Sequence, residues 1–228
     1  MALEEVRSRI ERACTAGARN PRDITILAVT KGFGADAIEA ALAANLTNIG
    51  ENYYQEAADK FAAISWPNGS ARHFVGRLQR NKTRRIAALF DVVQTVDDLE
   101  LARALDEGAA AAHKTLNVLV QMNAAGDLRQ GVAPHALADF VSVLGACKNL
   151  RVRGLMVIGP SDYKETSAAF ERARVRFEQL RSASQGFDTL SMGMSDDLEL
   201  AIAAGSTMLR IGTALFGARP AKMIRGER

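Results

Sequence analysis

The run Ile24-Thr25-Ile26-Leu27-Ala28-Val29-Thr30-Lys31 decides the fold and holds the first functional clue. Its β-branched and apolar residues predict a buried strand. Because side chains alternate between the two faces of a strand, Lys31 shares a face with Leu27 and Val29. Burial disfavours the charged form of a lysine, which frees the amine lone pair for attack on an aldehyde. The alternative is a lysine that only extends from the strand end into water.

Similar short apolar runs recur along the chain and alternate with helical segments rich in Ala, Leu, Glu and Arg. We predict strands over residues 24–31, 48–51, 73–76, 92–96, 116–122, 154–159, 189–193 and 208–212. The predicted helices between them span residues 35–44, 53–64, 81–90, 97–112, 135–147, 164–184 and 195–204. Apolar residues at helical spacing also predict an amphipathic helix within residues 1–20.

The alternation of strands and helices determines the predicted architecture. It indicates a parallel sheet with right-handed crossovers. About eight units favour a closed barrel over an open doubly wound sheet, and no G-x-G-x-x-G motif follows a strand. We therefore predict an α/β fold, a single (β/α)₈ TIM-type barrel domain over residues 1–228, with an additional N-terminal helix and a polar tail over residues 220–228.

Composition excludes several classes of function. Hydrophobic residues make up 48% of the chain and charged residues 24%, as in soluble globular proteins. A net charge of +3 is too small to predict nucleic-acid binding without a focused patch. The 2 cysteines lack metal-ligand spacing, so we expect no metal site and a reducing compartment. No apolar run approaches the roughly 20 residues of a membrane span, and no secretory signal is evident. We expect a cytoplasmic monomer without a membrane partner.

The last predicted strand leads into a candidate anion site, in Met208-Leu209-Arg210-Ile211-Gly212-Thr213. Arg210 and Gly212 lie two apart and point into the barrel, where a permanently charged guanidinium needs an acceptor. Gly212 lets a ligand approach the backbone, and Thr213 adds a hydroxyl at a helix start. Barrels of this type often hold phosphate after strands seven and eight. The alternative is a glycine needed only for the turn.

Two other loops contribute further candidates. Ser191 and Ser195 are placed to share the same phosphate, although Ser195 or Asp196 also fits as the N-cap of the next helix. Asn52 follows the second strand and is a candidate to hydrogen-bond a ligand near the lysine, with helix capping as the alternative. We expect His73, at the start of a strand, to be structural.

A basic run raises the question of nucleic-acid binding. It consists of Arg77, Arg80, Lys82, Arg84 and Arg85. Cations of this kind neutralise phosphates of a nucleic-acid backbone. Single-strand binders interleave such cations with aromatic side chains, and none are present in this run. We therefore favour a solvated helix face and expect no nucleic-acid partner.

Six segments closely resemble the pyridoxal 5′-phosphate homeostasis proteins (the YggS/PROSC type). They are residues 27–31, 49–56, 73–82, 153–156, 190–197 and 204–219, in the family's order and spacing. The loop Gly32-Phe33-Gly34 departs from the common form, and Arg77 occupies a position that the family varies. The resemblance implies a barrel similar to the N-terminal domain of alanine racemase and a pyridoxal phosphate cofactor.

The resemblance also implies a role for each candidate residue. Lys31 corresponds to the lysine that carries the cofactor as a Schiff base, and Arg210 to an arginine near the pyridine nitrogen. The phosphate-binding segments correspond to Ser191 to Ser195 and to Gly212 and Thr213, and Asn52 lies near the cofactor ring.

The expected chemistry favours a protein that binds the cofactor and does not use it in catalysis. A cation beside the pyridine nitrogen disfavours its protonation and weakens the ring as an electron sink. A racemase also needs a second acid/base, which alanine racemases take from outside the barrel domain, and only Tyr53, Tyr54 and Tyr163 are present here. We predict a cofactor-binding protein of vitamin B6 homeostasis with no catalytic residues, which passes pyridoxal phosphate to apo-enzymes.

Three alternatives stay open at this point. One is a weak racemase-like enzyme that uses Lys31 alone or with Tyr53 or Tyr54. Another is a Schiff-base aldolase acting on phosphorylated sugars, and the last is a nucleic-acid-binding protein. The sequence specifies neither the recipient enzymes nor the mechanism of release.

Overall fold

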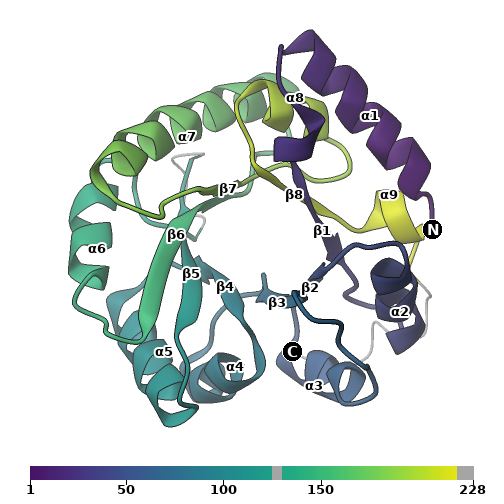
Figure 1. Cartoon of the computed structure of the whole chain (residues 1–228). Helices are drawn as coiled ribbons and strands as arrows, with labels where there is room; N and C mark the ends of the chain where they lie inside the picture. Colours follow the sequence, from purple (N-terminus) through teal and green to yellow (C-terminus); the bar gives the residue numbers. More distant parts are fainter. Residues whose placement is uncertain (125–129, 220–228) are drawn as a thin grey trace.

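In the computed structural model, which describes residues 1–124 and 130–219, eight parallel strands close into a barrel in chain order. They are β1 (Thr25–Val29), β2 (Asn48–Glu51), β3 (Ala71–Phe74), β4 (Val92–Val96), β5 (Leu116–Met122), β6 (Leu150–Val157), β7 (Thr189–Ser191) and β8 (Met208–Ile211). Helices surround this barrel (Figure 1). The predicted (β/α)₈ fold is confirmed. The predicted polar tail over residues 220–228 lies outside the described residues.

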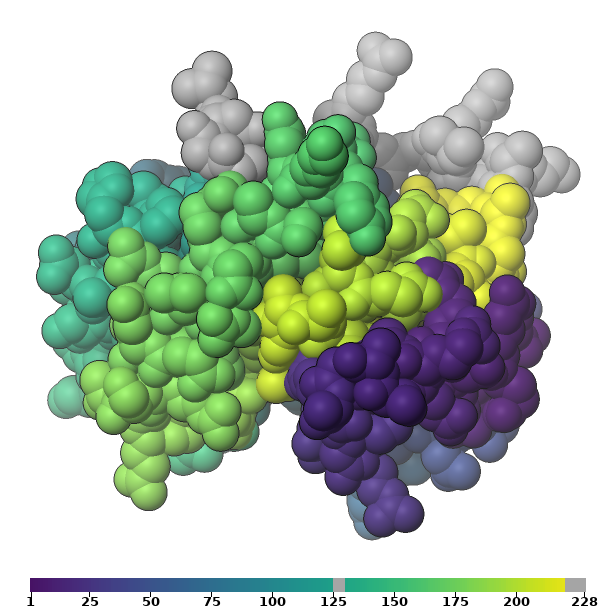
Figure 2. Space-filling view, turned by 90° about the horizontal axis from the view of Figure 1, so that it is seen from above, coloured from purple at the N-terminus to yellow at the C-terminus, as the bar shows by residue number. Residues whose placement is uncertain are grey.

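The helices follow the predicted order. They are α1 (Leu3–Ala16), α2 (Ala35–Ala43), α3 (Tyr54–Phe61), α4 (Thr83–Leu89), α5 (Leu99–Ala111), α6 (Leu137–Leu144), α7 (Tyr163–Ala183), α8 (Leu198–Ala203) and α9 (Thr213–Phe216). The predicted N-terminal helix is confirmed as α1, which packs against α8. Arg9 and Glu199 form an ion pair of 2.7 Å across this contact. Figure 2 shows the two chain regions side by side, purple against yellow.

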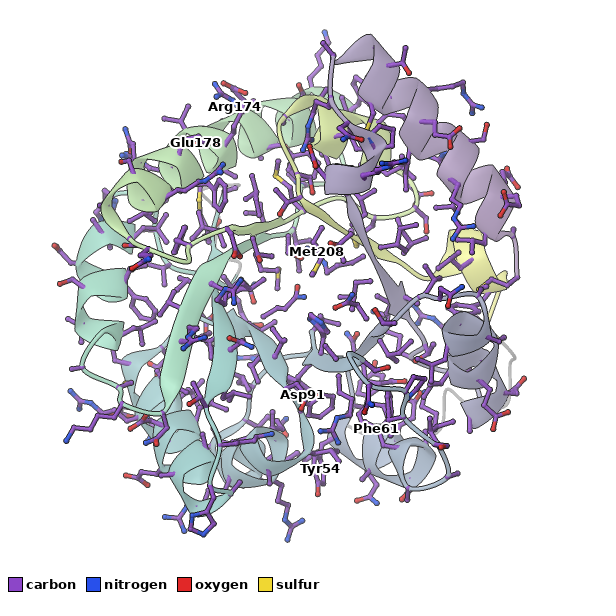
Figure 3. All side chains as sticks on the ribbon, viewed as in Figure 1. Tyr54, Phe61, Asp91, Arg174, Glu178 and Met208 are labelled. Atoms are coloured by element: carbon purple, nitrogen blue, oxygen red, sulfur yellow. The ribbon has the colours of Figure 1, made fainter. Side chains whose placement is uncertain are left out.

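The register of the barrel brings the first and last strands together. β1 pairs with β2 on one side and with β8 on the other, so that Leu27 lies opposite Arg210. Leu27, Val29 and Met208 pack together as a separate apolar cluster, and Figure 3 shows Met208 in the barrel interior. The pairing therefore places the end of β1, where Lys31 follows, beside Gly212.

Aromatic side chains fasten α3 to the barrel wall. The ring of Phe61 lies 5.0 Å from that of Trp66 and 5.5 Å from that of Phe90. Phe90 in turn contacts Phe74 of β3 at 5.2 Å. Edge-to-face contacts of this kind stabilise packing beyond the area that they bury. These contacts hold helix α3 against the barrel wall beside β3.

Strand β6 begins earlier than the sequence pattern predicts, at Leu150 instead of residue 154. Gly154 has φ +155° and lies beside a register shift between Val118 and Leu119 of β5. A side chain at this glycine would overlap the carbonyl of Thr189. Gly154 therefore marks an irregularity inside the strand and not its start.

Two classes of feature are absent from the described part of the chain. Over residues 1–124 and 130–219, no helix has the length and apolar character to cross a membrane. Within the same residues, His, Cys, Asp and Glu side chains form no group able to hold a metal ion.

Candidate functional site

A cavity of about 220 Å³ opens among the loops that follow the strands. Its polar lining consists of Lys31, Asn52, Ser195, Asp196, Arg210, Thr213 and Arg219, together with the backbone of Gly212. Its apolar lining consists of Val29, Phe33, Val75, Met156, Ile158 and Met194. The structure thus brings together six of the seven predicted site residues. The seventh, Ser191, lies outside this lining.

Lys31 is half-buried in the turn that follows β1 and faces the cavity. Burial lowers the pKa of its amine, and the positive charges of Arg219 and Arg210 lower it further. Glu51 and Glu56 act in the opposite direction. A lysine in this environment is neutral more often than a lysine in water, and only the neutral amine is a nucleophile.

Arg210 is held in a fixed orientation by uncharged acceptors. Its Nη1 donates to the carbonyl oxygen of Ser191 at 2.7 Å and to the Ser191 hydroxyl at 3.0 Å. Its Nη2 donates to the carbonyl oxygen of Val157 at 2.8 Å. Burial lowers the pKa of Arg210 to about 10, so that the guanidinium remains charged at neutral pH. A directed cation therefore lies at the floor of the cavity.

A chain of hydrogen bonds continues from Arg210 across the barrel interior. The Ser191 hydroxyl donates to Gln94 Oε1 at 2.7 Å, and Gln94 Nε2 donates to His73 Nδ1 at 3.0 Å. His73 Nε2 lies 3.0 Å from Asn48 Oδ1. Burial lowers the pKa of His73 to about 4, so the ring is neutral and carries its proton on Nε2. We call Asn48, His73, Gln94, Ser191 and Arg210 the inner cluster.

The inner cluster changes the interpretation of Ser191. The sequence predicts that this serine contacts phosphate, but its side chain is fully buried. Its hydroxyl accepts from Arg210 and donates to Gln94. Ser191 therefore supports Arg210 from inside the barrel, and direct phosphate contact does not fit this position.

Gly212, Thr213 and Ala214 lie at the start of α9, with Thr213 exposed and the other two half-buried. The N–H of Ala214 donates to the Ser195 hydroxyl at 3.1 Å. A Cβ at Gly212 would lie 3.2 Å from the Val29 carbonyl oxygen, which is tight, so glycine fits this position best. Gly212 and the hydroxyl-bearing residues Ser195 and Thr213 line the cavity together, and groups of this kind are used by anion sites. We call Ser195, Gly212 and Thr213 the anion cradle.

The predicted N-cap of α8 is wrong. α8 starts at Leu198 with Asp197 in the N-cap position. The Asp197 carboxylate accepts from the backbone N–H of Met194, in the preceding loop. The Ser195 hydroxyl instead accepts from the N–H of Ala214 in the first turn of α9. Sequence spacing alone does not distinguish these two helices, because the partner Ala214 is distant in the chain.

Asn52 does not cap a helix. The residue in the N-cap position of α3 is Tyr53, and no side chain caps that helix. Asn52 lines the cavity, and its buried Oδ1 has no hydrogen-bond partner among the described residues. Buried polar atoms are nearly always paired, so this oxygen is available to a donor on a bound molecule.

Two polar residues of the cavity lining were missed by the sequence analysis as site residues, Asp196 and Arg219. The aliphatic part of Arg219 lies over Gly32, where an added Cβ would meet its Cδ at 3.0 Å. Arg219 contributes a second positive charge beside the Lys31 amine. The only sequence signal was its place in the resembling segment 204–219.

The basic run lies apart from the cavity lining. Arg80 and Arg84 are exposed and form ion pairs with Glu100 and Glu107 of α5. Ion pairs of this kind between exposed side chains are typical of a solvated helix face.

Comparisons with known proteins agree with the fold. The family model described as alanine racemase, N-terminal domain, matches residues 2–220. Pyridoxal phosphate homeostasis proteins of Pseudomonas aeruginosa and Escherichia coli K12 are 44% and 43% identical, over 95% of this chain and 94% and 95% of theirs. The solved structure of PipY from Synechococcus elongatus with PLP bound is 34% identical, with TM-score 0.79, over 92% of this chain and 100% of that chain.

The chain therefore belongs to the alanine racemase N-terminal domain family and, within it, to the pyridoxal phosphate homeostasis proteins. The resemblance stated from the sequence is confirmed.

Proposed function

We propose that this protein binds pyridoxal phosphate as a Schiff base on Lys31 and serves vitamin B6 homeostasis in the cytoplasm. The observation that carries the proposal is a single cavity in which a half-buried lysine faces the anion cradle and Arg210. The names of the relatives support the same ligand, and PipY binds it.

Each group of the cavity has a role in this proposal. Lys31 would hold the aldehyde group through its amine. The anion cradle would hold the phosphate, and Asn52 Oδ1 would accept from a donor on the bound molecule. Bound pyridoxal phosphate supplies an electrophilic aldehyde and an electron-withdrawing ring. The residues present therefore fit this cofactor.

The same cavity gives little support to robust catalysis. Arg210 lines the cavity and stays charged, so it would disfavour a second positive charge on a bound ring. Tyr53 and Tyr163 are 46% and 70% exposed, and the described cavity lining contains no tyrosine. A racemase needs an acid/base on each face of the ring. We therefore infer that the protein holds the cofactor and passes it to apo-enzymes.

Borohydride reduction tests the proposal directly. The purified protein is mixed with pyridoxal phosphate, reduced and mapped by mass spectrometry. We expect the adduct on the peptide that contains Lys31 and its loss in Lys31→Ala. An adduct spread over surface lysines, or a wild-type protein that gains no visible absorbance, contradicts the proposal. Steady-state racemisation of an amino acid, lost in Lys31→Ala, would instead favour the racemase-like activity.

A further inference from the structure

A second polar cluster lies directly behind Lys31, on the helix side of the barrel wall. It consists of Thr30, Glu51, Glu56 and Lys60, which we call the outer cluster. Glu51 is fully buried and Lys60 is 7% exposed. Buried charges are rare unless they are paired and hydrogen-bonded, because removing a charge from water is costly.

Lys60 contacts the backbone on both sides of Lys31. Its Nζ donates to the carbonyl oxygen of Thr30 at 2.9 Å and to that of Phe33 at 3.1 Å. These two residues begin and end the turn that contains Lys31, and the Phe33 N–H donates to the Thr30 carbonyl. One ammonium group thus clamps the turn at both of its ends.

Glu56 holds the middle of the same turn. Its Oε1 accepts from the backbone N–H of Gly32 at 2.6 Å and from Lys60 Nζ at 2.7 Å. Gly32 follows Lys31 directly and has φ +76°, which a residue with a side chain rarely adopts. Helix α3 therefore supplies partners for three backbone groups within two residues of Lys31.

Glu51 ties this arrangement to the barrel. Its carboxylate pairs with Lys60 and accepts from the Thr30 hydroxyl at 2.6 Å. Its second oxygen, Oε2, is buried and has no partner among the described residues. Phe61, the neighbour of Lys60, packs against Trp66 and Phe90, so the helix end of this arrangement is also fixed by packing.

We propose that Lys60 and Glu56 are positioning residues that set the direction in which Lys31 enters the cavity. The inference rests on the proposed function, because the position of Lys31 matters only if its amine binds an aldehyde. Interactions that hold a reacting group in place contribute by orientation and not by chemistry. Neither side chain lines the cavity, so neither contacts the bound cofactor directly.

Four variants test the proposal. Glu56→Ala removes the acceptor of the Gly32 N–H, whereas Glu56→Gln keeps an oxygen there without the charge. Lys60→Met removes the donor to both carbonyls. Lys114→Met is the matched control, because Lys114 also donates to two backbone carbonyls, of Ala88 and Phe90, but precedes β5 at the opposite end of the barrel.

Two readouts separate positioning from general stability. The first is the dissociation constant for pyridoxal phosphate from visible absorbance. The second is the visible circular dichroism band of the bound cofactor, which reports how the chromophore is held. We expect Glu56→Ala and Lys60→Met to bind about tenfold more weakly, with a diminished band. Glu56→Gln and Lys114→Met should stay within about twofold of the wild type on the same scale.

Three outcomes overturn the inference. The first is a Glu56→Ala variant that matches the wild type in affinity and band, and the second is a Glu56→Gln variant that loses as much as Glu56→Ala. The third is a Lys114→Met variant that weakens binding as much as Lys60→Met. If Lys60→Met does not fold, the two Glu56 variants decide the matter. Failure of the proposed function is seen separately, as a wild-type protein that forms no reducible adduct on Lys31.

Discussion

The inner and outer clusters solve the problem of burying polar groups in opposite ways. The inner cluster holds one cation, Arg210, whose partners are all neutral side chains or carbonyls. The outer cluster is ionic, with Lys60 between the carboxylates of Glu51 and Glu56. Both clusters end at a cavity residue, the first at Arg210 and the second at the turn that carries Lys31.

The difference teaches what each cavity residue requires. A cation that faces the cavity must keep its charge and direction, and neutral acceptors fix its direction without cancelling the charge. A nucleophilic amine must stay accessible and uncharged. Within residues 1–124 and 130–219 no carboxylate forms an ion pair with Lys31 Nζ, and Glu56 and Lys60 bind only the backbone around it. The two clusters should therefore respond differently to substitution and to pH.

Replacing Gln94, at the centre of the inner cluster, should cause the largest loss of stability among the substitutions proposed here. Gln94→Leu keeps the size of the side chain but leaves His73 Nδ1 without a donor and the Ser191 O–H without an acceptor. We expect a loss of roughly 3–5 kcal/mol in the free energy of unfolding, because each unsatisfied buried group costs about 1–3 kcal/mol. Urea denaturation at pH 7 measures it. A loss below about 1 kcal/mol would mean that the chain of hydrogen bonds does not act as a unit.

Acid should weaken the inner cluster. Burial holds the pKa of His73 at about 4, below its ordinary 6.5, so the unfolded chain binds more protons in between. The stability due to neutral His73 is present above pH 6.5 and is lost as the pH falls through 4, by up to roughly 3 kcal/mol. Denaturation of wild type and His73→Gln between pH 4 and 7 checks this. Parallel pH profiles would contradict the assignment.

Base should weaken the outer cluster. Burial raises the pKa of Glu51 to about 7, against the pairing with Lys60 and the Thr30 hydroxyl. The contribution of protonated Glu51 is present below pH 4.5 and is lost as the pH rises through 7, by roughly 2–3 kcal/mol. The free energy of unfolding of Glu51→Gln should therefore rise relative to that of the wild type as the pH rises. A wild type that is favoured over Glu51→Gln at pH 8 would show that the ion pair with Lys60 dominates instead.

A surface ion pair provides the baseline for both clusters. The Arg9–Glu199 pair joins α1 to α8, and half of the Glu199 side chain is exposed. We expect Glu199→Gln to cost less than about 1 kcal/mol, and less still at high salt. Urea denaturation in low and high salt checks this. A cost as large as that of Gln94→Leu would remove the distinction between buried and exposed polar contacts.

Much of the fold follows from the sequence because its strands are short runs with clear boundaries. The predicted limits of β2, β4 and β5 match those of the structure. Where prediction fails, the cause is not local. β6 starts before Gly154, because a register shift in its pairing with β5 accommodates that glycine inside the strand. α9 is a single turn, which is too short to leave a periodic pattern in the sequence.

The site follows the same rule. Lys31, Arg210 and Gly212 line one cavity, as the sequence predicts, because they lie at the ends of the paired strands β1 and β8. Alternation along β8 accounts for the direction of Arg210, whereas Lys31 lies in the turn after β1. The residues that support the site from behind were not predicted, because their partners lie on other helices and strands. Gln94 is a polar residue in the middle of a buried strand, and Glu56 and Lys60 are one helical turn apart. Those signals indicate a constraint, but only the fold shows what they constrain.

Closure of the barrel makes the first strand a neighbour of the last, through the pairing of β1 with β8. During translation Lys31 leaves the ribosome well before Gly212 and Thr213, to which the proposed function assigns the phosphate. On that proposal, a nascent chain completes the site only when β8 has paired with β1. A ligand that binds across the seam stabilises only the closed form, by mass action. Binding of the cofactor should thus also stabilise the pairing of β1 with β8.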